Sequence, residues 1–235
     1  MTVRVRRVTT TRAGGVSAPP FDTFNLGDHV GDDPAAVRAN RSRLASAVGL
    51  SEDRLVWMNQ VHGDHVAVVE APPPGPLEAT DALVTTAARL ALVVVTADCV
   101  PVLMADSRAG VVGAAHAGRV GAAAGIALRT LSAMVDAGAR VGDVSVLLGP
   151  CVSGPNYEVP EDMAADVESR LPGSRTMTAR GTPALDLRAG LARQLAEAGV
   201  GAIDVDPRCT VADQGLFSHR RDGVTGRLAS LVWMQ

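Results

Sequence analysis

Residues 91–117 read ALVVVTADCVPVLMADSRAGVVGAAHA, and this stretch decides the fold class. It contains three apolar runs of strand length, at residues 91–96, 102–105 and 111–115, with only short segments between them. Strands that follow one another so closely are arranged like a hairpin. The stretch therefore argues against a purely parallel, doubly wound sheet.

The rest of the chain adds further strands and four helices. The helices are predicted from Asp33-Pro34 to Gly49, over residues 121–137, from Pro160 to about Leu171, and from Asp186 to about Gly199. The other main strands are predicted at residues 3–8, 55–58, 66–70, 144–148, 203–205 and 228–234. Residues 71–76 and 172–183 are predicted loops, too short to separate domains. We therefore expect a single α/β domain over residues 1–235, an α+β layered sandwich of mixed β-sheets flanked by outer helices.

Composition and charge exclude several classes of function. The chain has 235 residues, 47% hydrophobic and 20% charged, which is ordinary for a globular protein. Its formal charge of −3 gives no general attraction to nucleic acid or to an anionic membrane, so neither is an expected partner. The absence of lysine excludes a Schiff-base lysine and the lysine of a Walker phosphate loop. Three cysteines and no apolar signal segment predict a cytoplasmic protein with reduced thiols.

Three of the histidines and cysteines lie in similar contexts. His62, Cys99 and His116 each follow a predicted strand, where a rigid element can present a side chain to a cleft. Two imidazoles and one thiolate suit Zn²⁺, and three protein ligands leave a fourth position open for water or substrate. The three residues form no compact motif, so the pattern alone equally allows a catalytic Cys–His dyad that uses Cys99.

Two further segments are candidates for anion binding. Glycines at positions 113, 118, 121 and 125 form a strand-to-helix turn that could present backbone N–H groups to a phosphate. Residues 217–223, FSHRRDG, place two arginines beside Asp222. This arrangement is either a turn with a solvated ion pair or a guanidinium clamp for a phosphate or carboxylate.

Longer motifs carry a family resemblance. They are Asn59-Gln60-Val61-His62-Gly63, Thr96-Ala97-Asp98-Cys99-Val100-Pro101-Val102, Ala115-His116-Ala117-Gly118, Gly149-Pro150-Cys151, Tyr157-Glu158-Val159, residues 206–210 and 217–227, Phe24-Asn25-Leu26-Gly27 and Asn40-Arg41. With these motifs in order along essentially the whole chain, the sequence resembles a bacterial family long described as laccase-domain proteins or polyphenol oxidases. That family is since understood as zinc-dependent purine nucleoside phosphorylases.

The resemblance implies a reaction and a set of site residues. The reaction is phosphorolysis of adenosine, inosine, guanosine and methylthioadenosine, with adenosine deamination as a further activity, so the partners are purine nucleosides and phosphate. The implied cofactor is Zn²⁺, which can orient phosphate or activate a water. The implied residues are His62, Cys99 and His116 as metal ligands and catalytic residues, Arg41 as a further catalytic residue, and Asn25, Gln60, Asp98 and Arg221 as substrate-binding residues. Arg41 and Arg221 would supply charge for the phosphate.

One position departs from the family pattern. The family commonly has Trp-Arg after the His-Ala-Gly turn, whereas Arg119-Val120 follows it here. If the family's arginine contacts substrate, the displaced Arg119 is expected to point elsewhere, and ring stacking on the tryptophan is lost. The preferred purine, the choice between phosphate and water as nucleophile, and the oligomeric state stay open.

Three other interpretations compete with the phosphorylase. A multicopper laccase needs about ten histidines and one cysteine for four coppers, and this chain has five histidines, which excludes it. A cysteine hydrolase of a peptidoglycan precursor would use Cys99 as nucleophile and His116 as base, without metal. A non-catalytic zinc-binding partner of the cell-division machinery would close the fourth metal position, with His65 or Cys209 as the candidate ligand.

Overall fold

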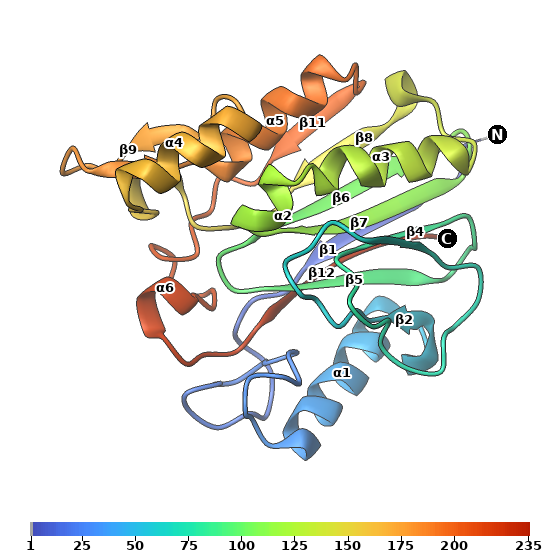
Figure 1. Cartoon of the computed structure of the whole chain (residues 1–235). Coiled ribbons are helices and arrows are strands. Elements are labelled where there is room, and N and C mark those ends of the chain that lie inside the picture. The colour runs from blue at the N-terminus through green and yellow to red at the C-terminus, as the bar shows by residue number, and fades with distance from the viewer. Residues whose placement is uncertain (1) are drawn as a thin grey trace.

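The computed structural model describes residues 2–235 and arranges them in four layers, in which two β-sheets stack between outer helices (Figure 1). The six-stranded sheet has the order β11 (Ala202–Val205), β8 (Ser145–Leu148), β6 (Val100–Asp106), β7 (Val111–Ala117), β4 (Ala82–Thr85) and β3 (Val66–Val68). The four-stranded sheet has the order β1 (Val5–Thr9), β12 (Leu228–Met234), β5 (Ala91–Thr96) and β2 (Leu55–Val56). Both sheets are mixed, because each contains parallel and antiparallel pairs.

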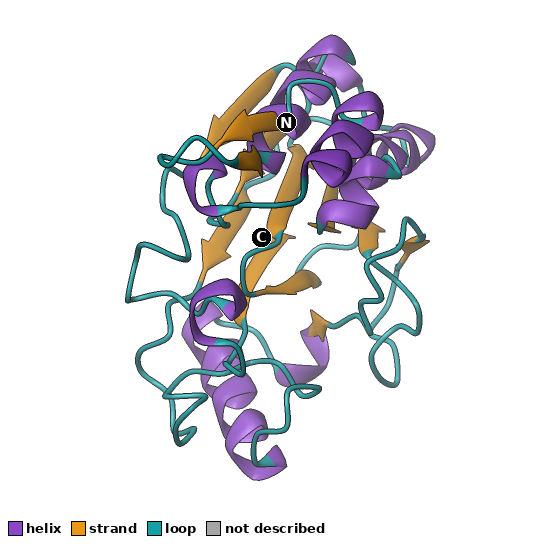
Figure 2. Ribbon diagram, turned by 60° about the vertical axis from the view of Figure 1, so that its left-hand side comes forward, coloured by secondary structure: helices purple, strands orange, loops and turns teal. Residues whose placement is uncertain are grey.

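Helices cover the two outer faces. α3 (Ile126–Asp136), α4 (Glu161–Arg170) and α5 (Leu187–Glu197) lie on the side of the six-stranded sheet, and α1 (Pro34–Val48) lies against the four-stranded sheet (Figure 1). Figure 2 shows the same stacking from another direction, with the strands between two groups of helices. The predicted layered α/β fold, with mixed sheets and outer helices, is thus confirmed.

Side chains of the central strands alternate between layers. In β5, Leu92 and Val94 enter the core between the two sheets, whereas Val93 faces the α1 layer. In β6, Leu103 enters the same core between the sheets, and Met104 faces the helices on the other side. Because successive side chains of a strand point to opposite faces, a strand buried on both faces is apolar throughout. This explains the uninterrupted apolar runs of the sequence.

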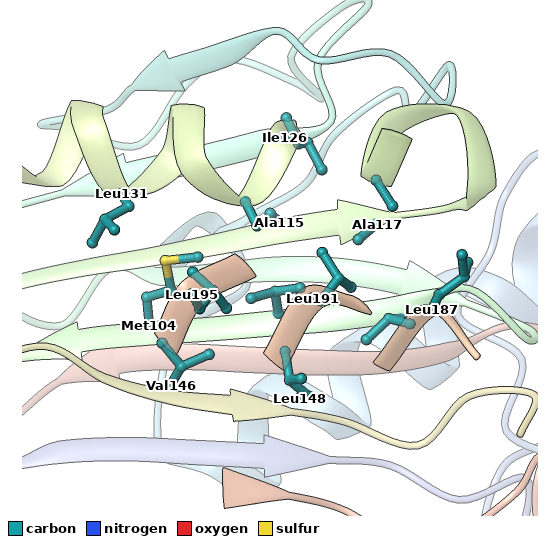
Figure 3. Packing of buried hydrophobic residues seen from close by; sticks show 14 of the residues in the cluster. Met104, Ala115, Ala117, Ile126, Leu131, Val146, Leu148, Leu187, Leu191 and Leu195 are labelled. Atoms are coloured by element: carbon teal, nitrogen blue, oxygen red, sulfur yellow. The ribbon is translucent and has the colours of Figure 1, made fainter. Parts of the chain in front are cut away.

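The layer between the six-stranded sheet and its helices is filled largely by leucines. Leu187, Leu191 and Leu195 follow one face of α5 at a spacing of four residues and pack toward Met104 and Leu148 of the sheet (Figure 3). This packing fixes α5 on the sheet, and the N-terminal end of the helix lies near the cavity described below, because Leu187 also lines it.

The three runs of residues 91–117 do not form one hairpin. β6 and β7 pair antiparallel, with Val102 opposite Ala115, but β5 belongs to the other sheet. The chain crosses between the sheets at a corner over residues 97–99, where Asp98 has a φ of 98°. The expectation of a hairpin-like succession is therefore correct for β6 and β7 and wrong for β5, because β5 pairs with β12 and β2 of the four-stranded sheet.

The predicted helices are all present, with one correction. The helix expected over residues 121–137 is two helices, α2 (Arg119–Ala123) and α3, which are separated at Gly125 with a φ of 86°. Only glycine adopts this conformation without strain, so the chain can change direction there. The region 172–183, expected as a loop, contains β9 (Arg175–Met177) and the first residue of β10 (Pro183–Leu185). β4 and the short α6 (His219–Asp222) were also not predicted.

Among the helices of residues 2–235, none combines the length and the apolar character needed to cross a membrane.

Candidate metal centre and its cavity

The fold brings His62, Cys99 and His116 together. Their candidate ligand atoms all lie within 4.8 Å of one another, and the Cys99 Sγ is 3.8 Å from Nε2 of His62. The two imidazole rings meet edge to face, with centroids 4.7 Å apart. Two imidazole nitrogens and a thiolate sulfur at this separation can hold one metal ion.

The three residues reach the site from different local structures. His62 lies in the loop after β2, Cys99 occupies the inter-sheet corner directly before β6, and His116 lies inside β7 opposite Pro101. The expectation that each side chain follows a strand is therefore wrong for His116. The antiparallel pairing of β6 with β7 brings Cys99 beside His116, since Val100 is opposite Ala117.

A buried carboxylate that the sequence did not single out connects both histidines. Oδ1 of Asp81 is 2.9 Å from Nδ1 of His116, and the same carboxylate accepts hydrogen bonds from the N–H groups of Val61, His62 and Gly63 at 3.2, 2.9 and 2.8 Å. Burial raises the pKa of Asp81, but His116 and these N–H donors outweigh it, and the net pKa is lowered. Asp81 thus leaves Nε2 of His116 for the metal and fixes the loop that carries His62.

Gly118 makes room for the ligands. A Cβ atom at this position would lie 2.7 Å from Cδ2 of His62 and 3.1 Å from the sulfur of Cys99. The first of these separations is shorter than any that real Cβ atoms tolerate. The glycine of the His-Ala-Gly turn therefore allows close packing around the candidate metal ligands. The sequence alone shows the glycine but not the contact that requires it.

The electrostatics of the centre favour an ionised sulfur. Burial raises the pKa of the Cys99 thiol, but the charge and hydrogen bonding of His116 and His62 outweigh it and lower the pKa. In the same way, burial lowers the pKa of His116, and the Cys99 thiolate and Asp81 raise it overall. A thiolate is the form of cysteine that binds metal.

The three candidate ligands line a cavity of about 340 Å³, a size within the usual range for small-molecule sites. Its wall also contains Tyr157, His219 and three arginines, Arg119, Arg220 and Arg227. Within residues 2–235 none of these arginines has a carboxylate oxygen within 4.0 Å. The cavity is thus bordered by three guanidinium groups that form no salt bridge in the described part of the chain, although Arg220 donates to Glu158 O and Arg227 donates to Thr225 O and Gly226 O. The displaced Arg119 lies in this wall.

Two of the expected substrate-binding residues line the cavity but are occupied by the protein. The side-chain amide of Gln60 donates to Val95 O at 2.9 Å and accepts from Val95 N at 2.8 Å, so it extends the edge of β5. The carboxylate of Asp98 accepts from Thr210 Oγ1 at 2.5 Å, Ser218 Oγ at 2.7 Å and Arg220 N at 2.6 Å. Gln60 thus holds the backbone of β5, and Asp98 holds two side-chain hydroxyls and one backbone N–H of the cavity wall.

The other expected residues lie outside the cavity lining. Asn25 is fully buried and hydrogen-bonds Gly27 and Arg227. Arg41 donates to Leu26 O, pairs with Asp28 and lies over the ring of Trp57, with its Cζ 3.9 Å from the ring centroid. These contacts satisfy both side chains within the protein.

The guanidinium group of Arg221 is likewise engaged in contacts within the protein. Its guanidinium donates to the carbonyl groups of Thr210, Asp213 and Leu216, and it pairs with Asp222 at 2.8 Å. The arginine next to it in the sequence, Arg220, lines the cavity instead. Of the two interpretations of FSHRRDG, the ion pair within a turn describes Arg221.

The chain is similar in sequence to proteins named purine nucleoside phosphorylase and similar in fold to solved bacterial structures. The chain is 69% identical over all of its length, and over 94% of the relative, to a purine nucleoside phosphorylase of Mycobacterium bovis. It is 57% identical to one of Corynebacterium glutamicum, with 98% of this chain and 94% of the relative covered. Among solved structures it superposes on YlmD from Geobacillus stearothermophilus with a TM-score of 0.92 and 34% identity, covering 98% and 92% of the two chains. A Neisseria meningitidis protein gives a TM-score of 0.89 and 36% identity, with coverage of 100% and 98%.

Residues 6–235 match the family model described as multi-copper polyphenol oxidoreductase laccase, and the chain belongs to this family.

Proposed function

We propose that the protein is a zinc-dependent purine nucleoside phosphorylase that cleaves adenosine, inosine, guanosine and methylthioadenosine with phosphate, with adenosine deamination as a second activity. One observation carries the proposal: a His-Cys-His metal group and three arginines without a carboxylate partner among residues 2–235 line the same cavity. The names of the relatives from M. bovis and C. glutamicum support the reaction.

Zinc is the metal that fits the donor set. Two imidazoles and one thiolate suit zinc with a fourth position open, and zinc bound there would supply a Lewis acid to an oxygen of a substrate. The family description mentions copper, but five histidines in the chain are too few for the four coppers of a laccase. The proposed location is the cytoplasm, where Cys99 stays reduced.

The arginines of the cavity account for phosphate. Guanidinium groups bind phosphate oxygens through paired N–H donors, and a partly buried arginine interacts with an anion more strongly than an exposed one. Arg227 lines the cavity and is half-buried, and its Nη1 donates to the carbonyl groups of Thr225 and Gly226, which leaves its remaining N–H groups for an anion. Arg119 and Arg220 border the same cavity beside Tyr157. We propose that these three residues, rather than Arg41 and Arg221, hold the phosphate.

The test uses zinc-loaded protein with inosine or guanosine, with and without phosphate. Free base and ribose 1-phosphate should form only with phosphate and should disappear in Cys99→Ala. Arg227→Met should raise the KM for phosphate by about 10-fold or more, since a hydrogen bond to a charged group contributes about 1.5–3 kcal/mol. The matched control is Arg129→Met, which removes an exposed ion pair with Asp64 outside the cavity. No turnover of any purine nucleoside by zinc-loaded protein would refute the proposal.

One observation favours a second candidate. Cys99 lies within 4.8 Å of His116, and His116 pairs with Asp81; this order of residues is of the kind that activates a cysteine nucleophile and would suit a hydrolase of a peptidoglycan precursor. Such an activity would survive complete removal of the metal, whereas phosphorolysis would not. A non-catalytic zinc partner protein is less well supported, because the ligand group in the described part of the chain includes neither His65 nor Cys209.

A further inference from the structure

His219 lines the cavity with one of its ring nitrogens already committed. Nδ1 lies 2.7 Å from the carbonyl oxygen of Gly223. A carbonyl oxygen only accepts, so Nδ1 carries a hydrogen and donates it. The same hydrogen bond exists whether the ring is neutral or protonated. Nε2 is therefore the ring nitrogen that is left for a ligand in the cavity.

The backbone of His219 is fixed relative to the metal ligands. Its two neighbours, Ser218 and Arg220, donate to opposite oxygens of the Asp98 carboxylate, at 2.7 and 2.6 Å. Asp98 is the residue before Cys99. These bonds tie the start of α6 to the corner that carries the metal thiolate, so the imidazole is held beside the cavity by a supported segment rather than by a free loop.

Other cavity groups are less suited to proton transfer. His62, Cys99 and His116 are the candidate metal ligands. The Asp98 carboxylate already accepts hydrogen bonds from Thr210, Ser218 and Arg220, so it is engaged within the protein. Burial raises the pKa of the Tyr157 hydroxyl, which makes it a weaker acid.

We propose that Nε2 of His219 protonates the purine base as its bond to the sugar breaks. This inference rests on the phosphorylase proposed above. A phosphate oxygen forms a bond to C1′ of the sugar, and the C1′–N9 bond breaks with its electron pair passing to the purine. The proton on Nε2 moves to N7, so the base leaves as a neutral purine and the imidazole is left neutral. The ring then regains a proton from solvent. A leaving group that departs neutral lowers the barrier, and a placed acid contributes about 10²–10⁴-fold.

A nucleoside that needs no proton separates this role from a structural one. In 7-methylguanosine the base already carries a methyl group on N7 and a positive charge, so it can leave without an acid. In His219→Asn the amide can still donate to Gly223 O but cannot transfer a proton. The zinc-loaded variant should lose about 10²-fold or more in kcat/KM for guanosine and change by less than about threefold for 7-methylguanosine. The control is His65→Asn, an exposed histidine outside the cavity lining, which should leave both values unchanged.

Several outcomes would overturn the inference. An equal loss on both nucleosides would mean that His219 only supports the fold, and so would a small loss on guanosine. His29 is the other cavity histidine outside the metal group. If His29→Asn lost activity on guanosine alone and His219→Asn did not, His29 rather than His219 would be the proton donor. The inference fails alone if the wild-type protein cleaves guanosine with phosphate but the two-substrate ratio does not change. If the wild-type protein cleaves neither nucleoside, the phosphorylase proposal fails as well.

Discussion

Two aspartates, Asp81 and Asp98, organise opposite sides of the cavity. Asp81 is fully buried directly before β4 and holds the two histidines of the candidate metal centre, through the ring of His116 and the backbone N–H of His62. Asp98 lies at the inter-sheet corner and holds the wall formed by α6 and Thr210. Neither carboxylate is free for a ligand. Metal binding and cavity shape therefore depend on separate groups, so substitutions should damage them separately.

The largest effect is expected from Asp81→Asn. The amide keeps the size of the side chain but loses the charge that orients His116, and outer partners of metal-bound histidines typically contribute 10–100-fold to metal affinity. We expect zinc affinity to fall by about that factor in competition with a chromophoric chelator. Asp106→Asn is the matched control, because Asp106 is also a buried carboxylate with three N–H donors, outside the cavity. Equal zinc affinity in Asp81→Asn and wild type would remove Asp81 from the metal centre.

Asp98→Asn should give the reverse pattern. Zinc affinity should stay within about threefold, because Asp98 does not contact the metal histidines. Loss of its charge weakens three hydrogen bonds to the cavity wall, and a hydrogen bond to a charged group contributes about 1.5–3 kcal/mol. Urea unfolding should show a loss of about that size, together with a fall in nucleoside cleavage. Loss of zinc in this variant would show that the two aspartates do not act separately.

Gly118→Ala tests the space that both sides share. The added methyl group would clash with the ring of His62 and press on Cys99, and such overpacking costs about 1–3 kcal/mol. We expect several-fold weaker zinc binding by the same chelator assay and a lower midpoint of thermal unfolding. Gly142→Ala is the control, because no atom lies within 4 Å of its added Cβ. Similar zinc affinities in the two variants would contradict the close approach.

The smallest effect on activity is expected from Asp106→Asn, which instead reports on pH. Burial raises the pKa of Asp106, but the N–H groups of Ala109, Arg140 and Arg108 outweigh it and lower the pKa overall. A carboxyl whose pKa is lower when folded stabilises the protein above its unfolded pKa, about 3.9, and this contribution is lost as the pH falls through the folded value. The difference in unfolding free energy between wild type and Asp106→Asn should therefore be largest near neutral pH and shrink in acid. A difference independent of pH would refute this.

The sequence predicted the layered fold better than the site. Apolar runs located β5, β6 and β7 because these strands are buried on both faces. They could not show that β5 lies in a different sheet, because nothing in a run of valines indicates its pairing partner. The four-residue β4 gave too little pattern, and Asp81 was missed with it.

The arginines show a second limit. Adjacent letters reveal that Arg221 stands beside Asp222, but not that distant carbonyl groups consume its guanidinium. Arg119 looked displaced in sequence, yet it lies in the cavity wall. Which arginines keep free donors depends on loops that meet only in the folded chain.

The inter-sheet corner at residues 97–99 has a mechanical consequence. Gln60 attaches the His62 loop to β5 of one sheet, and Asp81, directly before β4, attaches the same loop to the other sheet. Cys99 directly precedes β6 and His116 lies in β7, both of that second sheet. The metal centre therefore depends on both sheets at once, and the layer between them, where Leu92 and Leu103 lie, helps to fix the spacing of its donors. Packed interiors transmit strain, so a methylene added or removed at these leucines should change the distances between the metal ligands without touching the ligands themselves.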